Sequence, residues 1–118
     1  VSMHVPLTVE TRAMVDNRFI NSFRKNIIII NTSRGKVLNT ADLVTNMKSG
    51  KVIGAALDVL EYESLSFEKI GLENFPEPMQ YLIHADNVIL TPHIAGWTVE
   101  SNRKHAEVLA EKILKTCF

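Results

Sequence analysis

The sequence predicts an α/β protein in which a parallel sheet is flanked by helices. Three short β-branched runs support this prediction, at residues 27–30, 52–59 and 88–91, and each is apolar at successive positions. Such runs are typical of strands that are buried on both faces. A helical pattern lies between the first two runs, and a right-handed crossover through that helix makes the strands parallel neighbours.

The remaining elements of the first half follow from local patterns in the chain of 118 residues. A further strand is expected at residues 2–5. Residues 11–23 carry a helical pattern, in which Asp16 and Asn17 predict the start of a second short helix. The crossover helix is expected over residues 40–50, with a Thr or Asn cap at its start and Gly50 as its stop.

In the second half, residues 60–86 are acidic and irregular, and their length favours a functional loop over a plain connector. The final helix is expected to be the longest. Thr98 is its capping residue, Glu100 stands in its first turn, and Lys112 and Lys115 stand near its C-terminus, where cations favour the helix dipole.

The net charge does not favour a nucleic-acid or anionic-membrane partner, because 13 basic residues balance 13 acidic ones. The charges are spread unevenly. Residues 1–59 hold eight basic and four acidic residues, whereas residues 60–118 hold five and nine. We therefore expect a bound anion to lie against the first half.

Cysteine and hydropathy indicate a cytoplasmic protein. Cys117 is the single cysteine and cannot form an internal disulfide, so a reducing compartment is expected. No apolar run approaches the roughly 18 residues that a membrane span needs, and the N-terminus lacks the pattern of a signal peptide. The spacing of His4, His84 and His105 does not predict a metal site.

Four ionisable residues follow the predicted strands: Arg34 after the first run, Asp58 and Glu63 after the second, and His93 after the third. Ligands of parallel α/β proteins bind beyond the carboxyl ends of the strands, so these residues are expected at one edge. Each alone is more often a solvated loop residue, but their convergence is typical of an active site. Nearby glycines let the backbone approach a ligand or only form turns.

Three motifs around these residues resemble, in order and spacing, those of the NAD-dependent D-2-hydroxyacid dehydrogenases, and the 3-phosphoglycerate dehydrogenase branch most of all. They are Asn31-Thr-Ser-Arg-Gly35, Gly54-Ala-Ala-Leu-Asp-Val59 with Glu63 beyond it, and Thr91-Pro-His-Ile-Ala-Gly96. The resemblance implies a Rossmann-type sheet. It also implies hydride transfer between NAD(H) and a D-2-hydroxy acid or 2-oxo acid, with 3-phosphoglycerate of serine biosynthesis as the expected substrate.

The resemblance assigns a role to each site residue. It makes Arg34 the ligand of the substrate carboxylate, His93 the general acid/base and Glu63 the carboxylate that orients His93. Glu61 is a rival for Glu63, because Ser64 stands where the family commonly has proline. The positions that the resemblance assigns to cofactor contact are Val5, Pro6, Thr32, Ser33, Asp58, which would hold the nicotinamide carboxamide, His93 and Gly96.

One element of a dinucleotide site is absent from the sequence. Glycines occur at 35, 50, 54, 71 and 96, so no G-x-G-x-x-G phosphate cradle is present. We therefore expect an incomplete fold in which residues 1–97 form the C-terminal half of an NAD-binding domain. Residues 98–118 would then be a crossover helix that leads back to a missing substrate-binding domain.

The resemblance implies a homodimer formed through the cofactor domain. Two alternatives to an enzyme stay open at this point. Members of the superfamily also serve as NAD(H)-binding corepressors, and without the phosphate cradle this chain alone would be an inactive fragment of the dehydrogenase.

Overall fold

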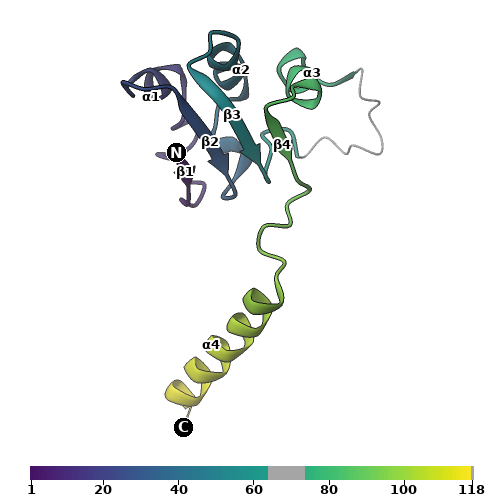
Figure 1. Ribbon diagram of the computed structural model, residues 1–118. Helices are drawn as coiled ribbons and strands as arrows, with labels where there is room; N and C mark the ends of the chain where they lie inside the picture. The colour runs from purple at the N-terminus through teal and green to yellow at the C-terminus, as the bar shows by residue number, and fades with distance from the viewer. Residues whose placement is uncertain (64–73, 118) are drawn as a thin grey trace.

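A computed structural model describes residues 1–63 and 74–117 (Figure 1). Its sheet has four parallel strands in chain order: β1 (Ser2–Met3), β2 (Ile27–Asn31), β3 (Val52–Leu57) and β4 (Val88–Leu90). The prediction of a Rossmann-type α/β sheet with parallel strands is confirmed. The register sets Met3 beside Asn31, Asn31 beside Leu57, and Leu57 beside Leu90. All four strands therefore end at one level, and the loops that follow them share one edge.

The helices are α1 (Asn17–Asn21), α2 (Thr40–Lys48), α3 (Glu77–His84) and α4 (Val99–Cys117), with a 3₁₀ turn η1 at Gly35–Val37. The predicted caps are present. The Asn39 side chain accepts a hydrogen bond from the Asp42 amide at 3.1 Å, and Thr98 Oγ1 accepts one from the Ser101 amide at 3.0 Å. Each bond pairs an amide at a helix start that has no partner within the helix.

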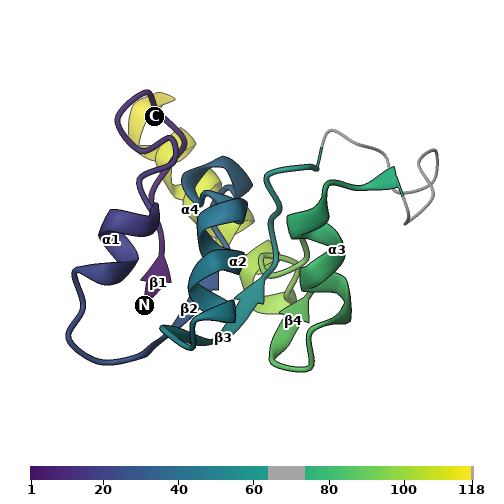
Figure 2. The same ribbon diagram turned by 90° about the horizontal axis from the view of Figure 1, so that it is seen from above.

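The hydrophobic core lies between the sheet and a layer formed by α1, α2 and α3, which lie side by side in Figure 2. Ile20, Ile29, Leu43 and Leu82 are at most 1% exposed and meet in this layer. Burial of each such side chain is worth about 1.5–3 kcal/mol. The core therefore holds the strands, and with them the loops at their carboxyl ends.

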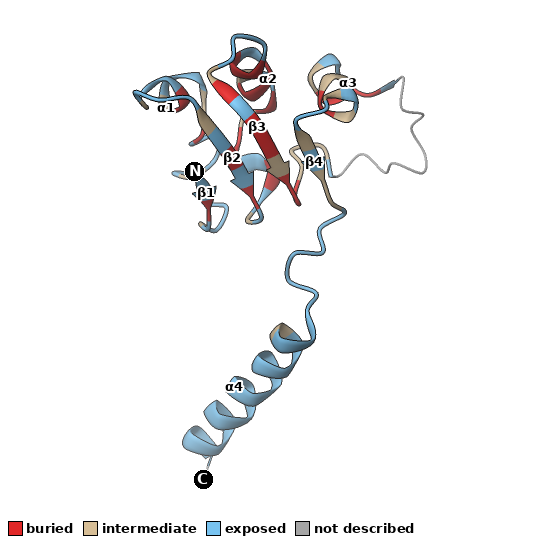
Figure 3. Ribbon diagram, viewed as in Figure 1, coloured by how far each residue is buried: buried red, intermediate tan, exposed pale blue. Residues whose placement is uncertain are grey.

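The prediction that the strands are buried on both faces is wrong for the described residues. Ile28, Ile30, Ile53 and Ile89 are 39–65% exposed (Figure 3). The reason is topological. Strands added in one direction, each by a right-handed crossover, place every connecting helix on the same face of the sheet. The second face is thus an open apolar surface.

Two local predictions also differ from the structure. Residues 11–13 form a turn rather than helix, with Thr8 and Thr11 hydrogen-bonded to each other, and Val15 pairs with Leu38 in an isolated β-bridge. The segment predicted to be irregular, residues 60–86, contains α3. Pro76 precedes this helix and Pro78 lies in its first turn, a position that tolerates proline because its amide has no helical partner.

Helix α4 extends away from the sheet, and none of its described residues is buried (Figures 1 and 3). Trp97, just before it, is 80% exposed. Within the described residues, no helix combines the length and the apolar character that crossing a membrane requires.

Candidate active site

The loop after β2 positions Arg34. Asn31, fully buried at the strand end, donates to the Arg34 carbonyl at 3.1 Å and accepts hydrogen bonds from the Ser33 amide and hydroxyl at 3.1 and 3.0 Å. These bonds close the turn and leave the Arg34 side chain in solvent. Its Nη1 donates to the Ser33 carbonyl at 2.7 Å. A guanidinium has five N–H donors, so most of the fork remains available for an anion.

Gly35 brings the β2 loop against the β3 loop. A Cβ atom at this position would lie 1.9 Å from the Leu60 carbonyl oxygen, well inside van der Waals contact. Because glycine has no Cβ, the two backbones can touch here. Arg34 and Glu63 consequently line a common hollow of about 240 Å³.

The β3 loop carries two carboxylates, which both line this hollow but make different contacts. Glu61 Oε2 accepts a hydrogen bond from the Thr40 amide at 3.0 Å, at the start of α2. Glu63 Oε1 accepts one from the Leu60 amide at 2.9 Å, and its Oε2 lies 3.6 Å from His93 Nδ1. The structure thus places Glu63, and not its rival Glu61, beside the imidazole.

Asp58 is 5% exposed and binds the loop after β4. Its Oδ1 accepts hydrogen bonds from the Thr91 hydroxyl at 2.6 Å and the Ile94 amide at 2.8 Å, and its Oδ2 accepts one from the Ala95 amide at 2.9 Å. Burial raises the pKa of Asp58, but these hydrogen bonds and the nearby His93 together hold the pKa below its usual value. The carboxylate stays ionised as an anchor.

His93 has a backbone φ of 56°, in the left-handed region. For a residue other than glycine this conformation costs roughly 1 kcal/mol or more. The His93 amide donates to the Asp58 carbonyl at 2.9 Å, and Asp58 also binds the next two amides. The same residue therefore fixes both the main chain of His93 and the turn that follows it.

The structure brings most of the predicted site residues to this edge. Asp58, Glu63 and His93 line one hollow of about 240 Å³, together with Leu60, Thr91 and Pro92. Val5, Pro6, Thr32, Ser33 and Arg34 line a second, of about 300 Å³, together with His4. Gly96 lines neither hollow and has nothing within 4 Å of a Cβ built on it.

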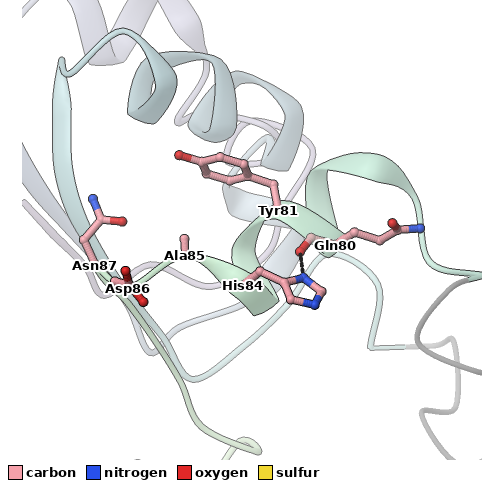
Figure 4. A pocket seen from close by; sticks show the side chains of 6 residues that line it. All are labelled: Gln80, Tyr81, His84, Ala85, Asp86 and Asn87. Atoms are coloured by element: carbon pink, nitrogen blue, oxygen red, sulfur yellow. Dashed lines mark hydrogen bonds between the residues drawn. The ribbon is translucent and has the colours of Figure 1, made fainter.

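A larger hollow, of about 460 Å³, lies at the opposite edge of the sheet between α3 and β4 (Figure 4). Its lining comes from one stretch of chain: Gln80, Tyr81, His84, Ala85, Asp86 and Asn87. His84 Nδ1 lies 2.7 Å from the Gln80 carbonyl one turn earlier (Figure 4). In residues 1–63 and 74–117, no three His, Cys, Asp or Glu residues are placed to hold a metal ion.

Sequence reasoning missed two residues that organise the site, Thr91 and Glu61. The motif around His93 contains Thr91 without indicating a role for it, and the sequence indicates Glu61 only as a rival partner for His93. The position of Thr91 does indicate such a role, because Thr91 directly follows β4 and lies beside the buried Asp58, which directly follows the neighbouring strand β3.

Comparisons with known proteins agree with this fold. Residues 1–95 match the family model described as D-isomer specific 2-hydroxyacid dehydrogenase, NAD binding domain. A glyoxylate reductase of Thermofilum pendens is 40% identical over 114 residues, which are 97% of this chain and 30% of that protein. A hydroxypyruvate reductase of Thermotoga maritima is 37% identical over 98% of this chain and 35% of its own length.

Solved structures give the same result. The NAD-complexed D-isomer specific 2-hydroxyacid dehydrogenase of Lactobacillus delbrueckii ssp. bulgaricus matches with a TM-score of 0.78 and 31% identity, over 98% of this chain and 36% of that one. The D-lactate dehydrogenase of Aquifex aeolicus, complexed with NAD and lactic acid, matches with a TM-score of 0.73 and 35% identity over 96% and 36%. This chain spans about a third of the length of these relatives.

Proposed function

The chain belongs to the NAD-binding domain family of the D-isomer specific 2-hydroxyacid dehydrogenases, and we propose that the whole protein catalyses reversible hydride transfer between NAD(H) and a D-2-hydroxy acid. The observation that carries this proposal is the pairing of His93 with Glu63, at the same sheet edge as Arg34. A module that only bound NAD(H), such as a corepressor, would have no need of this pair.

The residues present fit the nicotinamide end of the cofactor. Asp58 Oδ1 accepts two hydrogen bonds, whereas Oδ2 accepts one, so a carboxylate with about four acceptor positions has one left at Oδ2. Asp58 lines the hollow that also holds His93, and an amide N–H donor entering that hollow would suit the remaining position. When bound, NADH would supply the hydride that reduces the carbonyl carbon.

His93 is suited to move the proton. Glu63 lies against Nδ1, which leaves Nε2 as the ring atom that would give a proton to the substrate oxygen during reduction and take it back during oxidation. A carboxylate on the far side of the ring stabilises the protonated imidazole and fixes its orientation. The 3.6 Å separation is longer than a hydrogen bond, and such catalytic contacts commonly shorten when substrate is bound.

Arg34 is suited to bind the carboxylate of the substrate. Its exposed fork can make two parallel hydrogen bonds to a planar anion, and it shares a hollow with Glu63. A 2-oxo acid carries its carboxylate next to the reacting carbonyl. A carboxylate held by Arg34 would thus bring the carbonyl oxygen toward the His93 side of the same edge.

For the substrate we propose a small 2-oxo acid. The relatives described above are a glyoxylate reductase, a hydroxypyruvate reductase and a D-lactate dehydrogenase, and their substrates set the first choices for testing. The narrower prediction of 3-phosphoglycerate and serine biosynthesis stays a prediction, and 3-phosphohydroxypyruvate belongs in the same panel.

The experiment is NADH oxidation by the whole protein with glyoxylate, hydroxypyruvate, pyruvate and 3-phosphohydroxypyruvate in parallel. We expect turnover with at least one of them, and His93→Ala should lower kcat by roughly 10²-fold to 10⁴-fold while NADH still binds. No turnover with any 2-oxo acid, despite NADH binding, would favour the corepressor alternative. Turnover that is unchanged in His93→Ala would remove His93 from the mechanism.

The organisation around this domain is also proposed. Helix α4 has no buried residue and projects from the sheet, which supports the division into residues 1–97 and a crossover helix at 98–118 that leads to a substrate-binding domain. A homodimer through the cofactor domain and a cytoplasmic location stay predictions. Light scattering of the whole protein tests the dimer.

A further inference from the structure

We propose that Thr91 is a positioning residue: its hydroxyl fixes the Asp58 carboxylate in the orientation that holds Ile94 and Ala95 and, through them, the His93 imidazole beside Glu63. The kinetic consequence of this proposal rests on the function proposed above. The structural consequence, a loop whose order depends on one hydroxyl, does not.

The first step is the bond between Thr91 and Asp58. Thr91 Oγ1 lies 2.6 Å from Asp58 Oδ1, and the hydroxyl is placed to donate to the ionised carboxylate. A hydrogen bond to a charged group is short and about twice as strong as one between neutral groups. Both residues are fixed by the sheet, since the Thr91 amide donates to the Leu57 carbonyl at 3.1 Å and the Asp58 amide to the Asn31 carbonyl at 2.9 Å.

The second step is what the oriented carboxylate holds. One oxygen accepts from the Ile94 amide at 2.8 Å, and the other accepts from the Ala95 amide at 2.9 Å. These two bonds require the edge of the carboxylate, where the oxygen lone pairs lie, to point toward the loop. Among described residues, the Thr91 hydroxyl is the side-chain donor on Asp58, so it resists rotation of the carboxylate about its Cβ–Cγ bond.

The third step leads to His93. Its φ of 56° is unfavourable for a residue with a side chain, and such a conformation persists where the surroundings fix the backbone on both sides. Here the surroundings are the His93 amide on the Asp58 carbonyl and the two following amides on the Asp58 carboxylate. Once the carboxylate turns, the backbone of His93 can relax and carry the imidazole away from Glu63.

The test compares Thr91→Val, which keeps the shape and removes the donor, with Thr91→Ser, which keeps the donor. Thr45→Val is the matched control, because Thr45 lies on the exposed side of α2 and its hydroxyl bonds the Ala41 carbonyl of its own helix. Each variant of the whole protein is measured by amide hydrogen exchange over residues 91–97 and by steady-state reduction of the best 2-oxo acid in the panel.

In Thr91→Val we expect exchange over residues 93–95 to rise at least roughly 10-fold and kcat to fall roughly 10-fold to 100-fold, since small misplacements of a catalytic group have effects of that size. Thr91→Ser should restore both, and Thr45→Val should change neither. If Thr91→Val does not fold, Thr91→Ala is expected to give the same two changes.

Three outcomes would overturn the proposal. Unchanged exchange in Thr91→Val would show that the hydroxyl does not hold the loop. Faster exchange with unchanged kcat would reduce Thr91 to a structural residue, and a Thr91→Ser variant as impaired as Thr91→Val would show that the hydroxyl is not the active group. Failure of the proposed function is distinguishable, because the wild type itself would then show no turnover while the exchange measurement still decides the structural claim.

Discussion

Hollows lie at both ends of the strands, and a smaller one, at the carboxyl ends, holds the catalytic pair His93 and Glu63. The hollow at the amino ends, between α3 and β4, has about 460 Å³, but its lining residues come from one continuous stretch (Figure 4). The carboxyl-end hollow, as we call the one lined by Asp58, Glu63 and His93, has about 240 Å³, and its residues come from the loops after β3 and β4. Convergence of anchored side chains from separate loops, rather than volume, distinguishes the two.

After the loss of His93 itself, the next large effect in the carboxyl-end hollow is expected from Glu63. Glu63→Gln removes the negative charge beside His93 Nδ1 and should lower kcat roughly 10-fold to 100-fold, measured by steady-state NADH oxidation of the whole protein. Glu61→Gln is the control, because that carboxylate lies on the Thr40 amide and its loss should cost helix α2 about 0.5–1 kcal/mol at most. Equal loss of kcat in both variants would contradict the assignment of Glu63.

A smaller effect is expected from Arg34→Lys. Lysine keeps the positive charge but cannot form two parallel hydrogen bonds to a carboxylate, so KM for the 2-oxo acid should rise about 10-fold. We expect kcat to change less than KM, and substrate titrations at saturating NADH measure both. An unaltered KM would mean that another cation binds the substrate carboxylate.

Acid should weaken the anchoring of the loop after β4, which carries His93. Burial raises the pKa of Asp58, but its hydrogen bonds hold the pKa below the ordinary value, so the folded loop binds a proton less readily than the opened loop does. The anchoring is therefore complete above about pH 4 and declines as the pH falls through the lower pKa of the folded carboxylate. Protection factors of the Ile94 and Ala95 amides between pH 3 and 6 measure this.

The comparison for that measurement is Asp58→Asn. Its loop should be less protected at pH 6, and the protection should no longer depend on pH. A wild-type and a variant loop with the same pH dependence would show that another group governs the acid response.

The smallest effect is expected in the larger hollow. His84→Ala removes a side chain whose Nδ1 lies on the Gln80 carbonyl of its own helix, and no side chain from another loop depends on it in the described residues. We expect kcat and KM to stay within about 2-fold of the wild type. A loss comparable to that of Glu63→Gln would reverse the distinction between the two edges.

The sequence predicted the carboxyl-end site because its signals are local. A residue that directly follows a strand lies at the end of that strand, whatever the rest of the fold does, so Arg34, Asp58 and His93 could be placed in advance. The caps Asn39 and Thr98 were predictable for the same reason, since a capping bond spans three residues.

The features that were missed depend on distant parts of the chain. The exposure of Ile28 and Ile53 follows from the order of all four strands, and the isoleucine run alone cannot show it. Helix α3 was hidden because prolines in a first turn resemble prolines in a loop. The difference between Glu61 and Glu63 lies in which carboxylate reaches Thr40, a contact 21 residues apart in the sequence.

Gly35 has a consequence for how this site can vary. Because its backbone packs against the Leu60 carbonyl, the loop that carries Arg34 and the loop that carries Glu63 are in direct contact, with no room for a side chain between them. A substitution that makes room for a bulkier substrate in one loop must therefore be accompanied by a substitution in the other loop. Mutations in the two loops should therefore show strong epistasis, and directed evolution toward new 2-oxo acids would advance by paired substitutions rather than single ones.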